Sequence, residues 1–193
     1  MEVLTVKFFL SHMVSKGCIQ LVELKLSSIP SIKIISVRLG EVVLEMDKKS
    51  GAQIDIEGLF ESLGFKVLKH PDTLITEQAK LAAIELIYYA NNSNSLIRNS
   101  DYISDKLQMP YEKISKIFSR VTGNTLEKYI IQLKVEKAKE LIAGNEYSLS
   151  EISYMLGYSS VQYLSNQFKK TAGITVSEFK ENPIKYRLPI EDF

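Results

Sequence analysis

Residues 148–179 read SLSEISYMLGYSSVQYLSNQFKKTAGITVSEF, and they predict two short helices joined by a tight turn. Ser148, followed three residues later by Glu151, forms the capping-box pattern that satisfies unpaired amides at a helix start. Apolar residues then recur at helical spacing up to Leu156. Gly157 follows, and glycine readily adopts the left-handed conformation that ends helices. The sequence therefore predicts a helix, a turn and a second helix.

The second helix is expected to start after the turn, with Ser159 as its cap. Its inner face would consist of Val161, Leu164 and Phe168. The opposite face carries only polar side chains, namely Gln162, Ser165, Asn166 and Lys169. This arrangement is typical of a helix-turn-helix, whose second helix reads base edges. It also fits two amphipathic helices in an ordinary bundle.

The same pattern occurs a second time about fifty residues upstream. The upstream residues Ile114, Ser115, Phe118, Gly123, Thr125 and Tyr129 correspond to Leu164, Ser165, Phe168, Gly173, Thr175 and Phe179. The preceding helix repeats as well, because Ile103-Ser104 with Leu107 corresponds to Ile152-Ser153 with Leu156, at an offset one residue shorter. The one-residue difference in offset falls in the turn between the two helices. Such a repeat indicates that the helix pair is duplicated. Two copies are too few for a solenoid.

These motifs resemble the C-terminal DNA-binding domain of the AraC/XylS family of bacterial transcription regulators. The segments that carry the resemblance are 152–158, 163–170 and 173–175, and the match extends from about Asp101 to Asn182. The sequence departs from the family at Val176, where Pro is usual, at Lys134 and Lys180, where Arg is usual, and at Gln108, where Gly is frequent. The resemblance implies a double helix-turn-helix that binds double-stranded DNA.

The resemblance also places base-reading residues on both second helices. These positions are Glu112, Ser115 and Lys116 in the first helix-turn-helix and Gln162, Tyr163, Ser165 and Asn166 in the second. By side-chain chemistry, Lys116 suits guanine, Gln162 and Asn166 suit adenine, and Glu112 suits cytosine. Arg120, Lys169 and Lys170 are expected at phosphates. Asn166 stands where the family often has Arg, which predicts that the second helix-turn-helix binds DNA less tightly.

A long helix over residues 126–142 is expected to hold the two units apart. At about 1.5 Å per residue it would span roughly 25 Å, which suits two reading helices one duplex turn apart, at roughly 34 Å. A further helix over residues 76–91 precedes the repeats and is followed by a polar break at residues 91–95. This helix is interpreted as the first of the DNA-binding domain, with an interdomain connector as the alternative.

The N-terminal part alternates strand and helix patterns in the order βαββαβ. Strands are expected at residues 3–10, 32–39, 42–46 and 65–68, and helices at residues 18–27 and from about Asp55 to Leu63. This order is that of the ferredoxin-like split βαβ unit. The predicted fold class is therefore α+β, with a ferredoxin-like domain followed by an all-α double helix-turn-helix domain. The expected boundaries are 1–70 for the first domain, 71–76 for a linker and 77–193 for the second.

Residues 3–69 are similar to the heavy-metal-associated domain of copper chaperones and metal-pumping ATPases. The family's Gly-Met-x-Cys-x-x-Cys loop corresponds here to residues 12–18, HMVSKGC, so that Ser15 stands where the first metal thiolate would be. Soft metal ions need converging thiolates, and a hydroxyl does not replace one. We therefore expect no metal site and no cofactor, with Cys18 and His12 as weak candidates only. The domain is expected to serve interaction, dimerisation or sensing.

Composition sets further bounds on function. The 193 residues carry a formal net charge of +1, so any basic surface for DNA must be local. A single cysteine, Cys18, fits a reducing compartment, and no apolar stretch reaches membrane-spanning length, so a cytoplasmic protein without membrane contact is expected. No catalytic constellation is legible, which argues against an enzyme.

The sequence thus predicts a sequence-specific DNA-binding transcription regulator with an N-terminal interaction or sensing module. Its expected partners are double-stranded DNA and, through the N-terminal domain, a second copy or another protein. The alternative is a metal-handling protein whose helical half is a scaffold. Alkyl-transfer repair at Cys18 is remote, because Lys16 is the only cation nearby in the sequence. Sequence-selective retention of duplex in a gel shift separates the first two functions.

Overall fold

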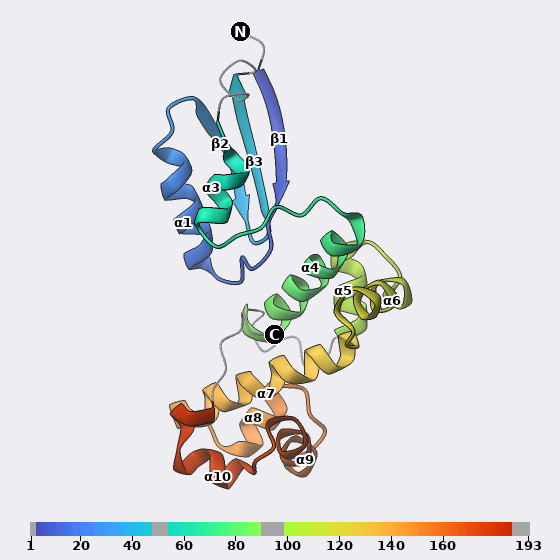
Figure 1. Cartoon of the computed structure of the whole chain (residues 1–193). Coiled ribbons are helices and arrows are strands. Elements are labelled where there is room, and N and C mark those ends of the chain that lie inside the picture. The colour runs from blue at the N-terminus through green and yellow to red at the C-terminus, as the bar shows by residue number, and fades with distance from the viewer. Residues whose placement is uncertain (1–2, 48–53, 90–98, 187–193) are drawn as a thin grey trace. The chain divides into compact units, whose positions relative to one another are not determined.

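The computed structural model describes residues 3–47, 54–89 and 99–186. Two compact units divide the chain, residues 1–81 and 82–193, and the division falls inside helix α4 (Pro71–Ile84) (Figure 1). The first unit contains a small β-sheet and the second is helical. The fold is thus mixed α and β, as predicted. Among the described residues, no helix has the length and apolar character needed to cross a membrane.

The sheet of the first unit contains three antiparallel strands, β1 (Val3–Phe9), β2 (Ile32–Arg38) and β3 (Glu41–Asp47). Their order is β1-β3-β2, so that β3 lies in the centre. Side chains alternate along β3, with Val42 and Leu44 fully buried. One face of the sheet therefore points into a core.

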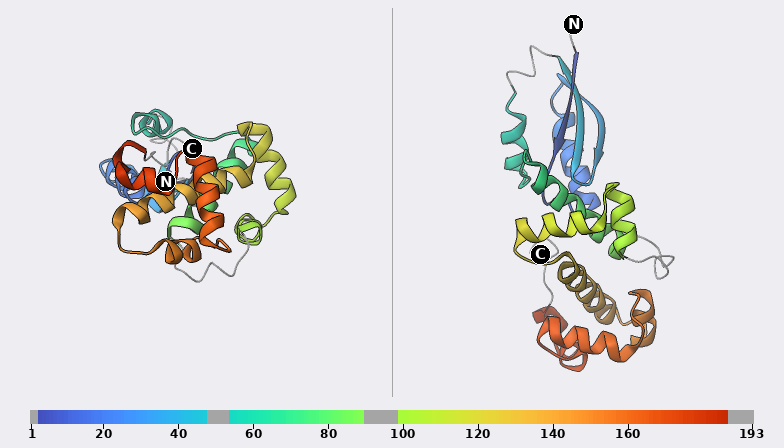
Figure 2. Two further views of the ribbon diagram at one scale, coloured as in Figure 1. Left: turned by 90° about the horizontal axis from the view of Figure 1, so that it is seen from below. Right: turned by 90° about the vertical axis from the view of Figure 1, so that its right-hand side faces the viewer.

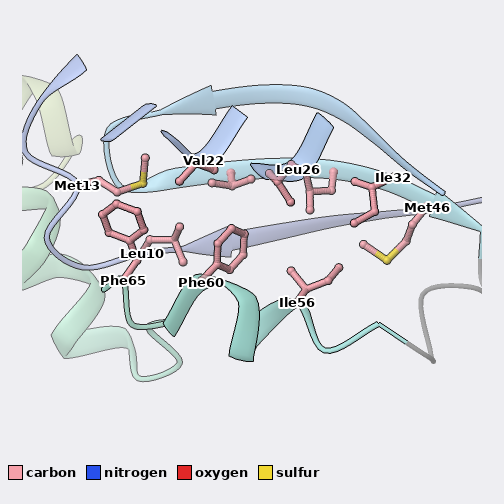
Figure 3. Packing of buried hydrophobic residues seen from close by; sticks show 11 residues of the cluster. Leu10, Met13, Val22, Leu26, Ile32, Met46, Ile56, Phe60 and Phe65 are labelled. Atoms are coloured by element: carbon pink, nitrogen blue, oxygen red, sulfur yellow. The ribbon is translucent and has the colours of Figure 1, made fainter. Parts of the chain in front are cut away.

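Helices α1 (Lys16–Ser27) and α3 (Ile56–Ser62) supply the other side of this core. Figure 3 shows side chains from both helices meeting those of the sheet. Asp55 caps α3 by accepting a hydrogen bond from the Gly58 amide at 2.8 Å, as expected for a helix start near Asp55. The buried cluster comprises Leu10, Met13, Val22, Leu26, Ile32, Val42, Leu44, Met46, Ile56, Phe60 and Phe65.

The strand predicted at residues 65–68 is reduced to a single antiparallel bridge between Leu10 and Val67. Two flanking hydrogen bonds, Ser11 N to Lys66 O at 2.9 Å and Leu68 N to Phe9 O at 2.7 Å, hold the segment beside the end of β1. The segment is short because it lies between the turn before Phe65 and the start of α4. The described residues thus show three strands and one bridge, and the full βαββαβ pattern stays a prediction.

Helix α4 begins at Pro71, five residues before the predicted start at Thr76. Proline is well tolerated in the first turn of a helix because the missing amide has no helical partner there. The hydroxyl of Thr73 donates to the carbonyl oxygen of His70 at 2.7 Å. Residues 71–76, which were expected to form a linker, are thus helical, and the domain boundaries themselves stay a prediction. The predicted polar break at residues 91–95 lies outside the described residues.

In the second unit, a π-helix, η1 (Glu85–Tyr89), continues directly from α4. Lys106 forms an ion pair with Glu85 at 2.8 Å, and the Lys137 amine lies 5.1 Å from the centre of the Tyr88 ring. This segment thus packs against the helices that follow it.

The long helix α7 (Leu126–Gly144) runs between two helix pairs in the second unit (Figures 1 and 2). The pair before it is α5 (Asn99–Leu107) and α6 (Tyr111–Thr122). The pair after it is α8 (Leu149–Met155) and α9 (Val161–Ala172), followed by α10 (Val176–Glu181) and the 3₁₀-helix η3 (Pro183–Tyr186). Both pairs pack against α7. The helix over residues 126–142 was predicted correctly to within two residues.

Gly40 generates a stability prediction for the first unit. It has φ +73°, and a Cβ atom there would collide with Cδ1 of Leu81. We expect Gly40→Ala to lower the free energy of unfolding by about 1–3 kcal/mol, because left-handed strain and overpacking add. Gly64→Ala is the matched control, since Gly64 has φ +87° but no atom within 4 Å of the added Cβ. Equal losses in denaturant unfolding would contradict the packing part of the argument.

Candidate nucleic-acid interface

The turn between α8 and α9 forms as the sequence predicts. Ser148 Oγ accepts from the Glu151 amide at 3.3 Å, and Glu151 Oε2 accepts from the Ser148 amide at 2.7 Å, so both halves of the capping box are present. Gly157 adopts φ +68°, and the next amide, that of Tyr158, donates to the carbonyl oxygen of Ser153 at 2.9 Å. These bonds satisfy both ends of the short helix α8.

The predicted cap of α9, Ser159, is wrong by one residue. Ser160 Oγ accepts from the Tyr163 amide at 3.1 Å, and Ser160 is extended, with φ −162° and ψ 158°. A capping side chain reaches the amide two or three residues ahead, and α9 starts at Val161, so Ser159 lies one position too early. The rest of the second helix follows the predicted pattern, with Leu164 and Phe168 fully buried.

The sequence repeat is also a structural repeat. Phe118 and Tyr129 pack with ring centres 5.5 Å apart, and the equivalent Phe168 and Phe179 pack at 5.7 Å. Gly123 and Gly173 end α6 and α9 in the left-handed conformation, with φ 71° and 75°. Thr125 and Thr175 then cap α7 and α10 by accepting from amides three residues ahead, at 3.2 Å in each case. We call this aromatic pair with its Gly and Thr the helix corner.

Two residues of the α5–α6 pair in the second unit, Gln108 and Val121, do not follow the expected pattern. Gln108 occupies the position of Gly157 and adopts φ +51°, while its Nε2 donates to the Asp105 carbonyl at 2.7 Å. Val121 lies at an apolar position by its spacing from Ile114, Ile117 and Phe118, but 40% of its surface is exposed. Helix α6 ends one residue later, so this last turn projects past the packed residues.

The predicted DNA contacts lie at the surface of the second unit. Exposed side chains are those of Glu112, Lys116, Arg120, Gln162, Tyr163, Asn166, Lys169 and Lys170, whereas Ser115 and Ser165 are half-buried. Neither Lys116 nor Gln162 is turned into the core. Burial of either side chain would have contradicted the prediction. Their contact with DNA stays a prediction.

Hydrogen bonds along α9 join the exposed side chains in pairs four residues apart. Gln162 Nε2 donates to Asn166 Oδ1 at 3.0 Å, and Gln167 Nε2 donates to the Tyr163 hydroxyl at 3.4 Å. The Tyr163 ring also packs edge-on against that of Tyr158 at 5.8 Å. Sequence reasoning did not single out Gln167, although its spacing of four from Tyr163 was a usable signal.

Lys134 and Tyr158 form a partly buried pair behind this face. The Lys134 amine lies 5.5 Å from the centre of the Tyr158 ring, and burial lowers the pKa of Lys134. Burial also raises the pKa of Tyr158 to about 12. The tyrosine therefore stays neutral at physiological pH, and its ring interacts with the lysine as a cation–π partner.

A buried ion pair links α7 to the end of the second unit. Glu136 and Lys139 are 7% and 4% exposed and form a direct ion pair, and Lys139 Nζ also donates to the Tyr186 carbonyl at 2.6 Å. Next to the pair lies a cavity of about 260 Å³. Its lining residues are Gln132, Val135, Glu136, Lys139, Thr171, Ala172, Lys185 and Tyr186.

The weak metal candidates in the first unit bond to neighbours in their own loop. Cys18 Sγ lies 3.4 Å from Ser15 Oγ and 3.9 Å from the His12 carbonyl oxygen, while His12 Nδ1 lies 2.8 Å from Ser11 Oγ. Within the described ranges, no three His, Cys, Asp or Glu side chains gather into a group that would hold a metal ion.

In a comparison with known proteins, residues 103–182 match the model of a family described as "Helix-turn-helix domain". The xylose operon regulatory protein of Escherichia coli K12 is 31% identical over 100 residues, covering 52% of this chain and 26% of that protein. The transcriptional activator RhaR of Mannheimia succiniciproducens is 27% identical over 108 residues, covering 54% and 38%. The chain thus spans between a quarter and two fifths of the length of these curated relatives.

Among solved structures, the C-terminal domain of AraT, a response regulator from Geobacillus stearothermophilus, matches with 18% identity and a TM-score of 0.48. The match covers 62% of this chain and 92% of the AraT domain. The family match and the curated relatives support the predicted helix-turn-helix domain in the C-terminal part of the chain.

The cap of α9 gives a direct stability prediction. We expect Ser160→Ala to lower the free energy of unfolding by about 1 kcal/mol, because the Tyr163 amide loses its acceptor. Ser159→Ala is the matched control, at an exposed neighbour with no capping bond, and should change stability by less than about 0.5 kcal/mol. Thermal or denaturant unfolding of both variants checks the assignment, and a larger loss at Ser159 would reverse it.

The capping box of α8 gives a pH prediction. Hydrogen bonds from the Ser148 side chain and backbone lower the pKa of Glu151 below its ordinary value of 4.5. On acidification the unfolded chain therefore takes up this proton first, so the stabilisation is present above about pH 4.5 and is lost as pH falls through the lower folded pKa. Glu151→Gln keeps an acceptor without the charge.

We expect the stability difference between the natural chain and the Glu151→Gln variant to shrink between about pH 6 and pH 3, as measured by denaturant unfolding at each pH. Glu146→Gln, at an exposed position before the box, is the matched control. A difference for Glu151→Gln that stays constant over this range would mean that the carboxylate charge contributes nothing to the cap.

Proposed function

We propose that this protein is a sequence-specific DNA-binding transcription regulator whose second unit binds duplex DNA through α6 and α9. The observation that carries the proposal is the repeated helix corner, which gives two helices of equal construction with exposed polar faces. The match of residues 103–182 to a helix-turn-helix family supports it. So do the regulatory roles named for the relatives, the xylose operon regulator and the activator RhaR.

We assign base contacts to the exposed faces of these two helices. The proposed readers are Glu112, Ser115 and Lys116 on α6 and Gln162, Tyr163, Ser165 and Asn166 on α9. Arg120, Lys169 and Lys170 are the proposed phosphate contacts, because two of them lie in the last turn of α9 and one in that of α6. Helix α7 has 19 residues, so its backbone spans roughly 28 Å. That length suits two reading helices about one duplex turn apart.

For the first unit we propose a ferredoxin-like fold derived from a heavy-metal-associated domain, used for interaction or sensing rather than catalysis. The strand order β1-β3-β2 and the bridge of Val67 to the end of β1 support it, because the fourth strand of that fold pairs beside the first. The proposed partners of this unit are a second copy of the chain or another protein. We place the regulator in the cytoplasm, where its DNA target would lie.

Selection of bound sequences from a random duplex pool tests the proposal, and two variants sharpen it. We expect Lys169→Ala to weaken binding to all sequences alike and to reduce the slope of log affinity against log salt by about one. Ser165→Ala should instead lower affinity for the selected site while leaving binding to random duplex unchanged. The full chain showing no selective, salt-sensitive binding would refute the regulator proposal.

A further inference from the structure

The cavity of about 260 Å³ in the second unit takes no part in the proposed DNA contacts. Its lining comes from three elements, which are α7, the last turn of α9 and η3. Val135, Glu136 and Lys139 are buried and form its floor, whereas Thr171 and Lys185 are exposed and lie at its rim. A ligand can therefore reach the cavity from the surface.

The ion pair on the floor does not use all of its hydrogen-bonding groups. An ammonium group carries three N–H donors. Lys139 gives one to Glu136 and one to the Tyr186 carbonyl, and the third has no acceptor in the described part of the chain. The floor of the cavity thus offers one charged donor.

Two neutral side chains of the lining also have unused hydrogen-bonding groups. The Gln132 amide and the Thr171 hydroxyl form no hydrogen bond to any side chain or backbone group within residues 3–47, 54–89 and 99–186. Each of these groups can both donate and accept. They are therefore complementary to a ligand hydroxyl, which also donates and accepts.

The charges of the described lining residues sum to a positive value. Glu136 and Lys139 balance each other, and Lys185 adds one further positive charge. Val135 and Ala172 supply apolar surface beside the polar groups. A ligand that fits this lining therefore combines an anionic group, a hydroxyl and a short carbon chain.

The volume of the cavity limits the size of this ligand. A water molecule occupies about 30 Å³ in the liquid, so the cavity has room for the equivalent of roughly nine waters. Pockets for drug-sized molecules begin at about 300 Å³. The cavity therefore suits a small organic anion.

We propose that this cavity binds a small hydroxycarboxylate. Its carboxylate accepts hydrogen bonds from Lys139 and Lys185, its hydroxyl bonds to Gln132 and Thr171, and its carbon chain packs on Val135. The bound anion joins α7 to the end of α9 and to η3. This site goes beyond the proposed function, because its occupation requires no DNA.

L-Lactate is the probe, because it is a hydroxycarboxylate of about six non-hydrogen atoms, for which a Kd in the millimolar range is expected. The full chain is titrated with lactate while the backbone amide signals of Ala172 and Lys185 are followed by NMR. We expect the shifts of these signals to saturate. Lactamide, which is neutral and has nearly the same shape, should bind about tenfold more weakly because it lacks the charge that pairs with the lysines.

Two substitutions test the assigned contacts. Lys185→Gln removes the charge at the rim and Gln132→Leu removes the amide, and each should raise the Kd for lactate about threefold to tenfold. Lys180→Gln is the matched control, because it makes the same change of charge at an exposed lysine of α10 outside the lining, and it should leave the Kd unchanged. Lys139 is kept, because removing one partner of a buried ion pair is strongly destabilising.

Saturable binding of lactate that both cavity substitutions weaken and Lys180→Gln does not weaken supports the site. Shifts that do not saturate, equal binding of lactamide, or an equal loss with Lys180→Gln would overturn it. Amide spectra of each variant without lactate report that the fold is intact. Because no DNA enters these measurements, their failure leaves the regulator proposal untouched.

Discussion

The helix corner is the interaction on which the rest of the second unit depends. At each corner, an aromatic residue on the reading helix packs against one on the next helix, Phe118 against Tyr129 and Phe168 against Phe179. Glycine ends the first helix and threonine starts the second, so the chain direction is set by backbone conformation as well as by packing.

Each corner fixes which way the polar face of its reading helix points. Because Phe118, Phe168 and Phe179 are almost fully buried, truncating any of them would remove about 3–5 kcal/mol, a large share of a typical domain's stability. The outer residues need no strong contacts of their own to keep their orientation. The amide pairs along α9 are instead held at the surface, where they are available to a partner.

Helix α7 adds a second constraint, the buried ion pair of Glu136 and Lys139. Taking two charges out of water is costly, and such a pair is tolerated when further hydrogen bonds satisfy it. Lys139 meets this condition by donating to the Tyr186 carbonyl, which joins η3 to α7. The pair therefore adds specificity to the packing of the second corner, whose core also contains Val135, Ala138 and Phe179.

Features set by local chain chemistry could be predicted from the sequence. The capping box at Ser148, the turn at Gly157 and the repeated corner depend on neighbouring residues, and they form as expected. Features set by the surroundings could not. Ser159 and Ser160 are adjacent candidates for the cap of α9. Which of them caps the helix depends on where the helix begins, and its first residue is Val161.

The same limit applies to the core and the sheet edge. Val121 fits the apolar face of α6 but lies on a turn that leaves 40% of its surface exposed, and residues 65–68 have a strand pattern but form a single bridge within the described part of the chain. Glu136 and Lys139 have the spacing of an ordinary surface pair, so their burial has no sequence signal. The exposure of the proposed DNA contacts was predictable because the repeat places them on equivalent helix faces, whereas the bonds among them depend on side-chain rotamers.

Gln108 makes the two halves of the second unit unequal. It holds a left-handed backbone conformation that costs a residue with a Cβ atom about 1 kcal/mol, whereas Gly157 adopts the equivalent conformation freely. Its bond to the Asp105 carbonyl offsets part of this strain. The loop before α6 should therefore open locally more often than the loop before α9, so the α5–α6 pair is the half of the second unit that changes its orientation more easily.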